Sequence, residues 1–254
     1  MYAPKQPTAL IISRPISGKP TSNMFWKRKQ NEPIETCSDA LYTALKGAVT
    51  QEGRIRVEDL ISAAAAVVGE AAIAAAGDLD PRRHDHAPGL RVFSTNVNRL
   101  ICDDKSLDEA PPDSIVGALR EKLSGCGFTR TDFPALSDVF TYFAANIGKK
   151  EDWGKVPLSI PQPHFPSLLP LRVTYETRPI VDKSLAPLGG DSSQRLRATT
   201  LALAKALCET RDILSRIVAT TLAIETVNGM AKTAPMTDGA MASIVEVQKS
   251  KVAE

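Results

Sequence analysis

The chain has 254 residues, with 31 Lys and Arg against 29 Asp and Glu, which gives a formal charge of +2 and a pI near 8.3. This charge is unevenly distributed, because residues 1–35 have a net charge of +4 and residues 36–254 therefore sum to −2. A folded part with a slight negative charge excludes a generally basic nucleic-acid binder, so no nucleic-acid partner is expected.

The apolar composition favours helices. Hydrophobic residues make up 43% of the chain but aromatic residues only 5%, and Ala is the most frequent apolar residue. Small side chains let helices approach closely, whereas a β-sandwich would need more β-branched and aromatic residues. We therefore predict an all-α, predominantly helical bundle with one long C-terminal helix, a Pro-rich extended strap and at most minor β-bridges.

The N-terminal segment 1–35 is predicted to be a disordered tail, because it combines Pro, Ser, Thr and Lys without apolar periodicity. Met24 opens the run Met-Phe-Trp-Lys-Arg-Lys, so a translation start at Met24 is an alternative to a start at Met1. The short basic cluster after Trp26 favours solubility over binding to lipid or nucleic acid, because stable adsorption needs a second anchor.

Residues 36–148 are predicted to form a helical core domain. Apolar periodicity and capping residues predict helices at residues 38–52, 58–76, 94–102, 113–124 and 132–147. The second of these is rich in Ala and apolar on all sides, which is typical of a helix surrounded by others, so we place it at the centre of the fold. Short extended pieces at 54–57 and 90–93 are expected to pair with each other.

The Ala-rich helix predicted at 58–76 has one charged residue in its interior, Glu70. A membrane span needs about 20 strongly apolar residues, and Ala is only weakly apolar, so no stable membrane insertion is expected. A buried carboxylate needs a partner or a raised pKa. Glu70 is therefore expected to reach an edge of the helix bundle or an Arg such as Arg99.

Residues 149–190 differ in character, with seven prolines and no helical period. Apolar residues occur throughout this segment, which is unlike a solvated linker. We predict a strap that lies over the helices or against a partner, with Leu171–Thr177 as its best candidate for a β-strand.

Residues 191–254 contain the clearest pattern. No Pro occurs between Ser192 and Met230, and apolar residues recur there with 4-3 spacing, which predicts one helix of nearly 40 residues with a length of about 58 Å. Pro235 ends this helix, and a short helix is predicted at 238–249.

A helix of this length exceeds the core of a domain of this size, so part of it is expected to pack against a second copy of the chain. The alternatives are packing within the bundle alone and a free coiled coil, which Thr and Asn at seam positions disfavour. Ile213 lies outside the 4-3 spacing and widens the apolar face. The side chains predicted to form the interface are Leu203, Leu207, Leu214, Ile217 and Ile224.

The loop that follows the Ala-rich helix is a candidate metal site, because it holds three carboxylates and two of the three histidines of the chain. Imidazoles two residues apart face the same way on a strand, where a divalent metal ion would bind them together with nearby carboxylates. Pro81 favours an irregular, solvated turn instead. The candidate ligands are Asp78, Asp80, His84 and His86.

The four cysteines, at positions 37, 102, 126 and 208, include no Cys-x-x-Cys pair of a zinc or redox site. They are predicted to be isolated thiols. Together with the lack of a long apolar run near Met1, this indicates a cytoplasmic protein in a reducing environment.

No sequence pattern identifies an enzyme. Neither a phosphate-binding Gly-rich pattern nor a Gly-x-Ser-x-Gly motif occurs. We predict an interaction or scaffold module without a cofactor, which self-associates through residues 192–231 as a homo-oligomer or binds a protein partner. The alternative is a helical metal-dependent enzyme with a divalent metal ion in the 78–86 loop, so the sequence leaves open whether the protein catalyses a reaction.

Overall fold

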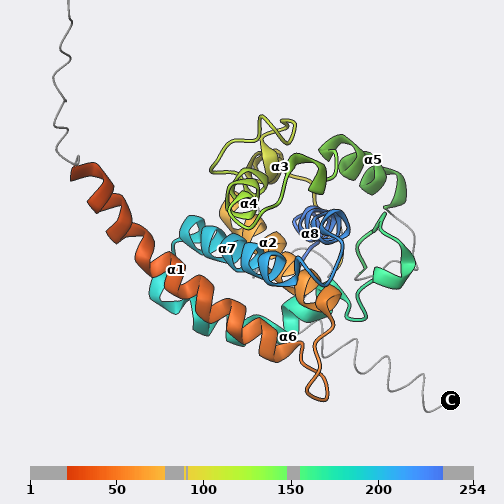
Figure 1. Ribbon diagram of the computed structural model, residues 1–254, viewed down its shortest axis with the longest axis horizontal. Helices are drawn as coiled ribbons and strands as arrows, with labels where there is room; N and C mark the ends of the chain where they lie inside the picture. The colour runs from red at the N-terminus through yellow and green to blue at the C-terminus, as the bar shows by residue number, and fades with distance from the viewer. Residues whose placement is uncertain (1–21, 78–88, 90, 148–154, 237–254) are drawn as a thin grey trace, which may run out of the picture.

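The computed structural model describes residues 22–77, 89, 91–147 and 155–236, with side chains described from residue 32 onwards. Within these ranges the chain forms eight α-helices and no β-strand, which confirms the predicted all-α class. Figure 1 shows helix α7 crossing the middle of the molecule, with α1 and α6 on one side and α3, α4 and α5 on the other.

Helix α1 (Ser22–Ala48) begins well before the predicted start at residue 38 and extends into the segment predicted to be a disordered tail. Four buried residues with helical spacing form its inward face, namely Ile34, Cys37, Leu41 and Leu45. This face packs against α7 and α6 (Figure 1). The sequence concealed the earlier start because Pro33 and the polar residues before it interrupt the apolar pattern.

Helix α2 (Val57–Ala76) is the centre of the fold, as its composition predicts. Fourteen of its 20 residues are buried, and α7 and α8 pack along it. The helix is long and apolar enough to cross a membrane, a property that buried core helices share, and 72% of its apolar window is buried inside the protein.

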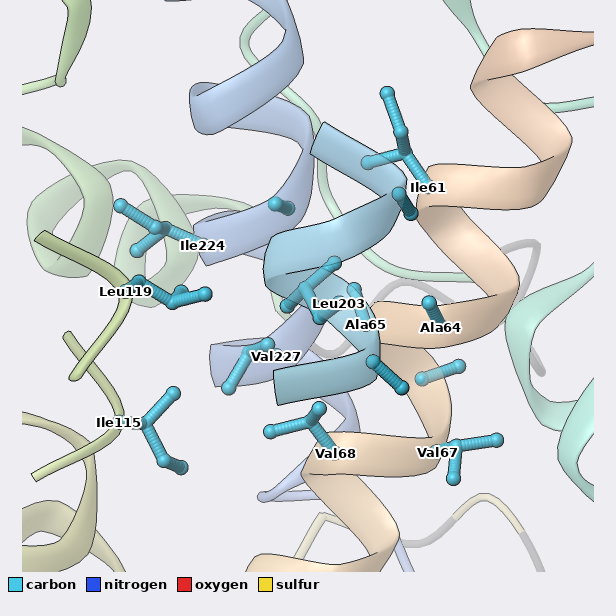
Figure 2. Packing of buried hydrophobic residues seen from close by; sticks show 14 of the residues in the cluster. Ile61, Ala64, Ala65, Val67, Val68, Ile115, Leu119, Leu203, Ile224 and Val227 are labelled. Atoms are coloured by element: carbon cyan, nitrogen blue, oxygen red, sulfur yellow. The ribbon is translucent and has the colours of Figure 1, made fainter. Parts of the chain in front are cut away.

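Helices α2 and α8 are in close contact at Gly69. A Cβ atom at this position would lie 2.6 Å from the Cβ of Met230 and 2.8 Å from the backbone nitrogen of Ala231, so only glycine fits without a shift. Figure 2 shows the neighbouring core, where side chains of α2, α4, α7 and α8 converge, with Leu203 of α7 near the middle of the view.

Helices α3 (Thr95–Cys102) and α4 (Ile115–Ser124) lie where the sequence predicts them. Each is capped by a serine, Ser94 or Ser114, whose hydroxyl oxygen accepts a hydrogen bond from the backbone N–H three residues later. Such caps satisfy an N–H group that has no partner within the helix. The helix predicted from residue 113 begins two residues later, because Ser114 caps it and Asp113 does not.

Helix α5 (Leu136–Asn146) begins later than predicted, after Pro134. A short 3-10 helix, η1 (Arg130–Asp132), precedes it and takes up the capping residues on which the prediction relied. Thr129 and Asp132 form a capping box there, in which the Asp132 carboxylate accepts the Thr129 backbone N–H at 2.7 Å.

Of the strap predicted at residues 149–190, residues 155–169 run without regular structure except for the 3-10 turn η3 (Gln162–His164), whereas residues 170–188 are helical, contrary to the prediction. The name strap is kept for residues 155–169. It lies against α5 and α8, because the Tyr142 hydroxyl donates to the Leu158 carbonyl at 3.0 Å and Glu225 accepts the Ser159 backbone N–H at 2.8 Å.

Helix α6 (Pro170–Leu185) shows that the strand predicted at Leu171–Thr177 is wrong. Pro170 occupies the first turn, where a missing N–H removes no helical hydrogen bond. The buried positions Leu171, Thr174 and Thr177 have helical spacing. Two of them are polar, but their hydroxyls donate to backbone carbonyls of the preceding turn, so they can be buried like apolar residues.

The single long helix predicted for 192–230 is also wrong, since the chain forms α7 (Ser192–Thr210) and α8 (Arg216–Met230). The two helices meet at a turn in which the carbonyl of Thr210 accepts the backbone N–H groups of Ile213 (3.0 Å) and Leu214 (3.1 Å). The turn contains neither Pro nor Gly, so no local signal marks it.

Two isolated β-bridges join Gln51 to Arg54 and Arg91 to Thr233. The predicted pairing of segment 54–57 with segment 90–93 is therefore wrong. A third short 3-10 helix, η4 (Ala186–Leu188), links α6 to α7. The helix predicted at 238–249 lies outside the described residues.

Candidate functional site

The candidate metal ligands Asp78, Asp80, His84 and His86 lie outside the residues that the structure describes. Within the described ranges, no group of three His, Cys, Asp or Glu side chains could hold a metal ion. The third histidine of the chain, His164, lies in the strap and contacts Glu58 of α2.

Two carboxylates at the start of α2 hold the strap. Glu58 contacts His164 with 3.0 Å between Oε1 and Nδ1. Burial alone would raise the pKa of Glu58, but its hydrogen bonds, including that from His164, and the nearby Arg56 outweigh burial and lower it. Asp59 is 3% exposed and accepts the backbone N–H of Ser167 at 2.6 Å. These two carboxylates thus fix the strap turn to the core.

A third carboxylate, Glu225 of α8, binds the strap at Ser159. Its Oε2 atom accepts the Ser159 N–H, whereas Oε1 has no hydrogen-bond partner among the described residues. Burial raises the pKa of Glu225 although the bonds from Ser159 oppose this shift. The burial of a half-satisfied carboxylate destabilises its charged form.

Glu225, Asn228 and Lys232 form a row of buried polar side chains, which begins in α8 and ends just beyond it at Lys232. Its Nζ atom donates to Asn228 Oδ1 at 2.7 Å and lies 5.1 Å and 5.3 Å from the ring centres of Phe140 and Phe143. Burial lowers the pKa of Lys232. Perturbed groups of this kind occur at functional sites and in buried structural networks alike. Because α5 and the strap cover the row, we assign it the role of positioning them.

Glu70, the charged residue inside α2, pairs with Arg178 of α6 at 3.1 Å and not with Arg99. Arg178 also donates to the Met236 carbonyl at 2.8 Å. Although Glu70 belongs to the central helix, its side chain is 21% exposed and lies at the edge of the helix bundle. It takes part there in a contact among α2, α6 and the segment after α8.

A cavity of about 500 Å³ opens between α1, α4 and α7. Apolar side chains and charges of both signs line it, and the charged residues are Glu35, Asp113, Glu121, Lys122 and Arg197. Three carboxylates beside two cations select neither an anionic nor a cationic ligand.

The side chains predicted to form a self-association interface divide into two groups. Four of them are at most 5% exposed and belong to the core of the single chain, namely Leu203, Leu207, Leu214 and Ile224. Ile217 is 39% exposed, and Ile213, which the 4-3 spacing excluded from the interface, is 72% exposed. The surface that this region offers to a partner is therefore the turn between the helices, residues 210–217, which we call the α7–α8 corner.

The corner is held on both sides. On the α8 side, Arg216 donates to the Gly127 carbonyl at 2.6 Å and lies 5.3 Å from the centre of the Phe128 ring. On the α7 side, Glu209 accepts hydrogen bonds from Tyr42 and from Lys46 of α1, the latter at 3.0 Å. The hydrogen bond from Tyr42 is the main cause that lowers the pKa of Glu209. The two isoleucines therefore stand on a fixed backbone.

A disulfide between Cys126 and Cys208 adds a covalent link beside the corner, with 5.8 Å between the Cα atoms. The prediction of four isolated thiols is wrong for this pair and holds for Cys37 and Cys102, which are free and buried. The two bonded cysteines are 82 positions apart, so no local spacing could reveal them. The argument from isolated thiols to a reducing cytoplasm loses its basis for these two residues.

Comparison with known proteins adds no relative, because no family, no curated protein and no solved structure matches the chain. The functional proposal therefore rests on the geometry of the described residues.

Proposed function

We propose that the protein is an interaction module that forms a homodimer through the α7–α8 corner. The observation that carries this proposal is the 72% exposure of Ile213 on a segment whose two sides are held by α1 and by the loop after α4. An apolar side chain on a fixed backbone loses little freedom on binding, so most of the free energy of its burial supports association. Ile217, four residues later, enlarges the apolar surface.

The charges at the corner favour a second copy of the same chain as the partner. Arg211 and Asp212 are neighbours of Ile213, with 3.3 Å between Nε and Oδ2 and with both side chains exposed. In a dimer with twofold symmetry, the same patch meets itself, so Arg211 of one copy can face Asp212 of the other. A surface with both charge signs beside an apolar centre is self-complementary in this sense.

The proposed contact is small. Four of the five side chains predicted for the interface are in the core. Of the five, Ile217 remains for association, together with Ile213 and the adjacent charges. Interfaces that bury less than about 1,200 Å² are typical of transient complexes. We therefore expect a reversible dimer that populates at high micromolar concentration.

Sedimentation velocity of the full chain from low to high micromolar concentration tests the proposal. The wild type is expected to dimerise with rising concentration, whereas Ile213→Asp places a charge in the contact and is expected to keep the protein monomeric. Phe93→Asp is the matched control, because Phe93 is similarly exposed, at 64%, and precedes α3.

A wild type that stays monomeric at high micromolar concentration overturns the proposal. So does dimerisation of Ile213→Asp with the affinity of the wild type. Loss of the dimer in Phe93→Asp, with Ile213→Asp unaffected, would place the contact on another surface and would equally refute the corner.

A further inference from the structure

The loop at residues 125–128 contacts both helices that meet at the corner. Cys126 is bonded to Cys208 in the last turn of α7, and the next residue, Gly127, accepts the hydrogen bond from Arg216 in the first turn of α8. The ring of Phe128, the residue after Gly127, lies under the Arg216 guanidinium. One short loop therefore fixes the end of α7 and the start of α8 relative to each other, and the α7 side of this arrangement is covalent.

The four cysteines differ in their access to solvent. Cys126 and Cys208 are half-buried. The free cysteines Cys37 and Cys102 are only 2% and 1% exposed, and burial raises the pKa of both thiols. A reductant in solution can therefore reach the disulfide, while the two free thiols are poorly placed to exchange with it.

We propose that the Cys126–Cys208 disulfide is a redox switch that controls self-association at the α7–α8 corner, an inference that rests on the proposed function. The reductant is a dithiol. One of its sulfurs, as thiolate, forms a bond to one cysteine sulfur while the Cys126–Cys208 bond breaks and the other cysteine leaves as thiolate. The second thiol of the reductant then displaces the first cysteine. Two electrons and two protons reach the cysteines, and the dithiol becomes a disulfide.

Reduction acts on the corner and leaves the helices in place. Without the disulfide, the last turn of α7 has no covalent link to the 125–128 loop, whereas Arg216 still holds the α8 side. Glu209 remains bound to Tyr42 and Lys46, so α7 stays packed on α1. The end of α7 then moves more freely relative to the 125–128 loop, so the orientation of Ile213 varies more than in the oxidised chain, and a contact that depends on a fixed backbone weakens.

The experiment compares the full chain in oxidised form, after reduction by a dithiol, and as the double variant Cys126→Ser/Cys208→Ser. Hydrogen exchange of residues 210–217, measured at a concentration at which the protein is monomeric, reports the corner independently of association. Exchange there is expected to be about tenfold faster in the reduced chain and in the double variant than in the oxidised chain. Sedimentation velocity is expected to show an increase of about tenfold in the dimer dissociation constant.

The variant Cys37→Ser is the matched control, because it removes a free thiol and leaves the disulfide intact. It is expected to show the exchange and the association of the oxidised wild type. Reoxidation of the reduced wild type is expected to restore slow exchange, which keeps the test valid if the double variant fails to fold.

The outcomes separate the switch from the proposed function. Oxidised and reduced chains that dimerise equally overturn the switch and leave the dimer intact. Equal exchange at the corner in the two states also overturns it. An oxidised chain that stays monomeric overturns the proposed function, and the switch with it.

Discussion

Helices α7 and α8 follow one another in the sequence with one continuous 4-3 spacing, yet they occupy different surroundings. Helix α7 buries ten of its 19 residues and keeps an exposed flank. Helix α8 buries 11 of its 15 residues, and all residues from Leu222 to Met230 are buried. The same apolar pattern thus describes a helix with an exposed flank and a helix whose residues from Leu222 onwards are enclosed.

The difference arises from segments that are distant in the sequence. Helix α8 packs against α2 and α5, and the strap lies on it through the bond from Ser159 to Glu225. Helix α7 has α1, α2 and α4 as neighbours and faces solvent on the remaining side. The spacing of apolar residues identifies the face of a helix toward the core, but not whether another segment covers the opposite face.

Truncation of one leucine in each helix tests this comparison with the largest expected effect. Leu222→Ala in α8 removes a side chain with 0% exposure and is expected to lower the free energy of unfolding by about 4 kcal/mol. Leu201→Ala in α7 removes a half-buried side chain and is expected to lower it by about 1 kcal/mol. Urea unfolding of both variants measures the two values. Equal losses would show that α8 is no more enclosed than α7.

An added methyl group on α2, at its contact with α8, tests how tightly α8 is enclosed. Gly69→Ala would place a Cβ against backbone and side-chain atoms of residues 230 and 231, and we expect a loss of about 2–3 kcal/mol. Gly47→Ala in α1 is the control. No atom lies within 4 Å of its added Cβ, so the better helix propensity of Ala is expected to raise stability by up to about 1 kcal/mol. Thermal unfolding that ranks Gly69→Ala with Gly47→Ala would contradict the close approach.

The substitution Glu225→Gln is expected to have the smallest effect on stability, and this effect is expected to depend on pH. Because burial raises the pKa of Glu225 in the folded chain, the native state binds this proton more tightly than the unfolded state. The contribution of Glu225 to stability therefore falls as the pH rises above about 4.3, the ordinary value of a glutamate. Glu225→Gln lacks this titration, so its stability relative to the wild type is expected to improve between acidic and neutral pH.

Urea titrations of both proteins at several pH values measure this difference. The substitution Glu209→Gln in α7 is the control, because Glu209 is exposed and its pKa is lowered, so its loss is expected to affect stability in the opposite sense with pH. A pH-independent difference between Glu225→Gln and the wild type would show that the pKa of Glu225 is the same in the folded and the unfolded chain.

Local signals predicted much of the fold. The starts of α3 and α4 lie within two residues of their predicted positions, and the Ala-rich composition places α2 at the centre, because capping and all-round burial leave patterns within a few residues. The failures have physical causes as well. Helix α6 was not predicted because two of its buried positions, Thr174 and Thr177, are polar. Their hydroxyls donate hydrogen bonds to carbonyls of the same helix, which the sequence pattern cannot show.

The candidate site was predicted only in part. The region 191–230 does contain the proposed contact, but the 4-3 spacing selected its buried residues and passed over Ile213. The signal was the position of this isoleucine outside the spacing. The disulfide joins residues brought together by tertiary packing of the α4 loop on α7, so only the fold reveals it.

The central position of α2 has a consequence for the order in which the protein is made. This helix is complete at Ala76, whereas α7 and α8, which cover it, end at Thr210 and Met230. At roughly 5–20 residues per second, a ribosome needs roughly 8–30 s to add these partners. During this time the apolar faces of α2 that α7 and α8 cover in the folded chain lack these partners. The core closes only when the last third of the chain has emerged.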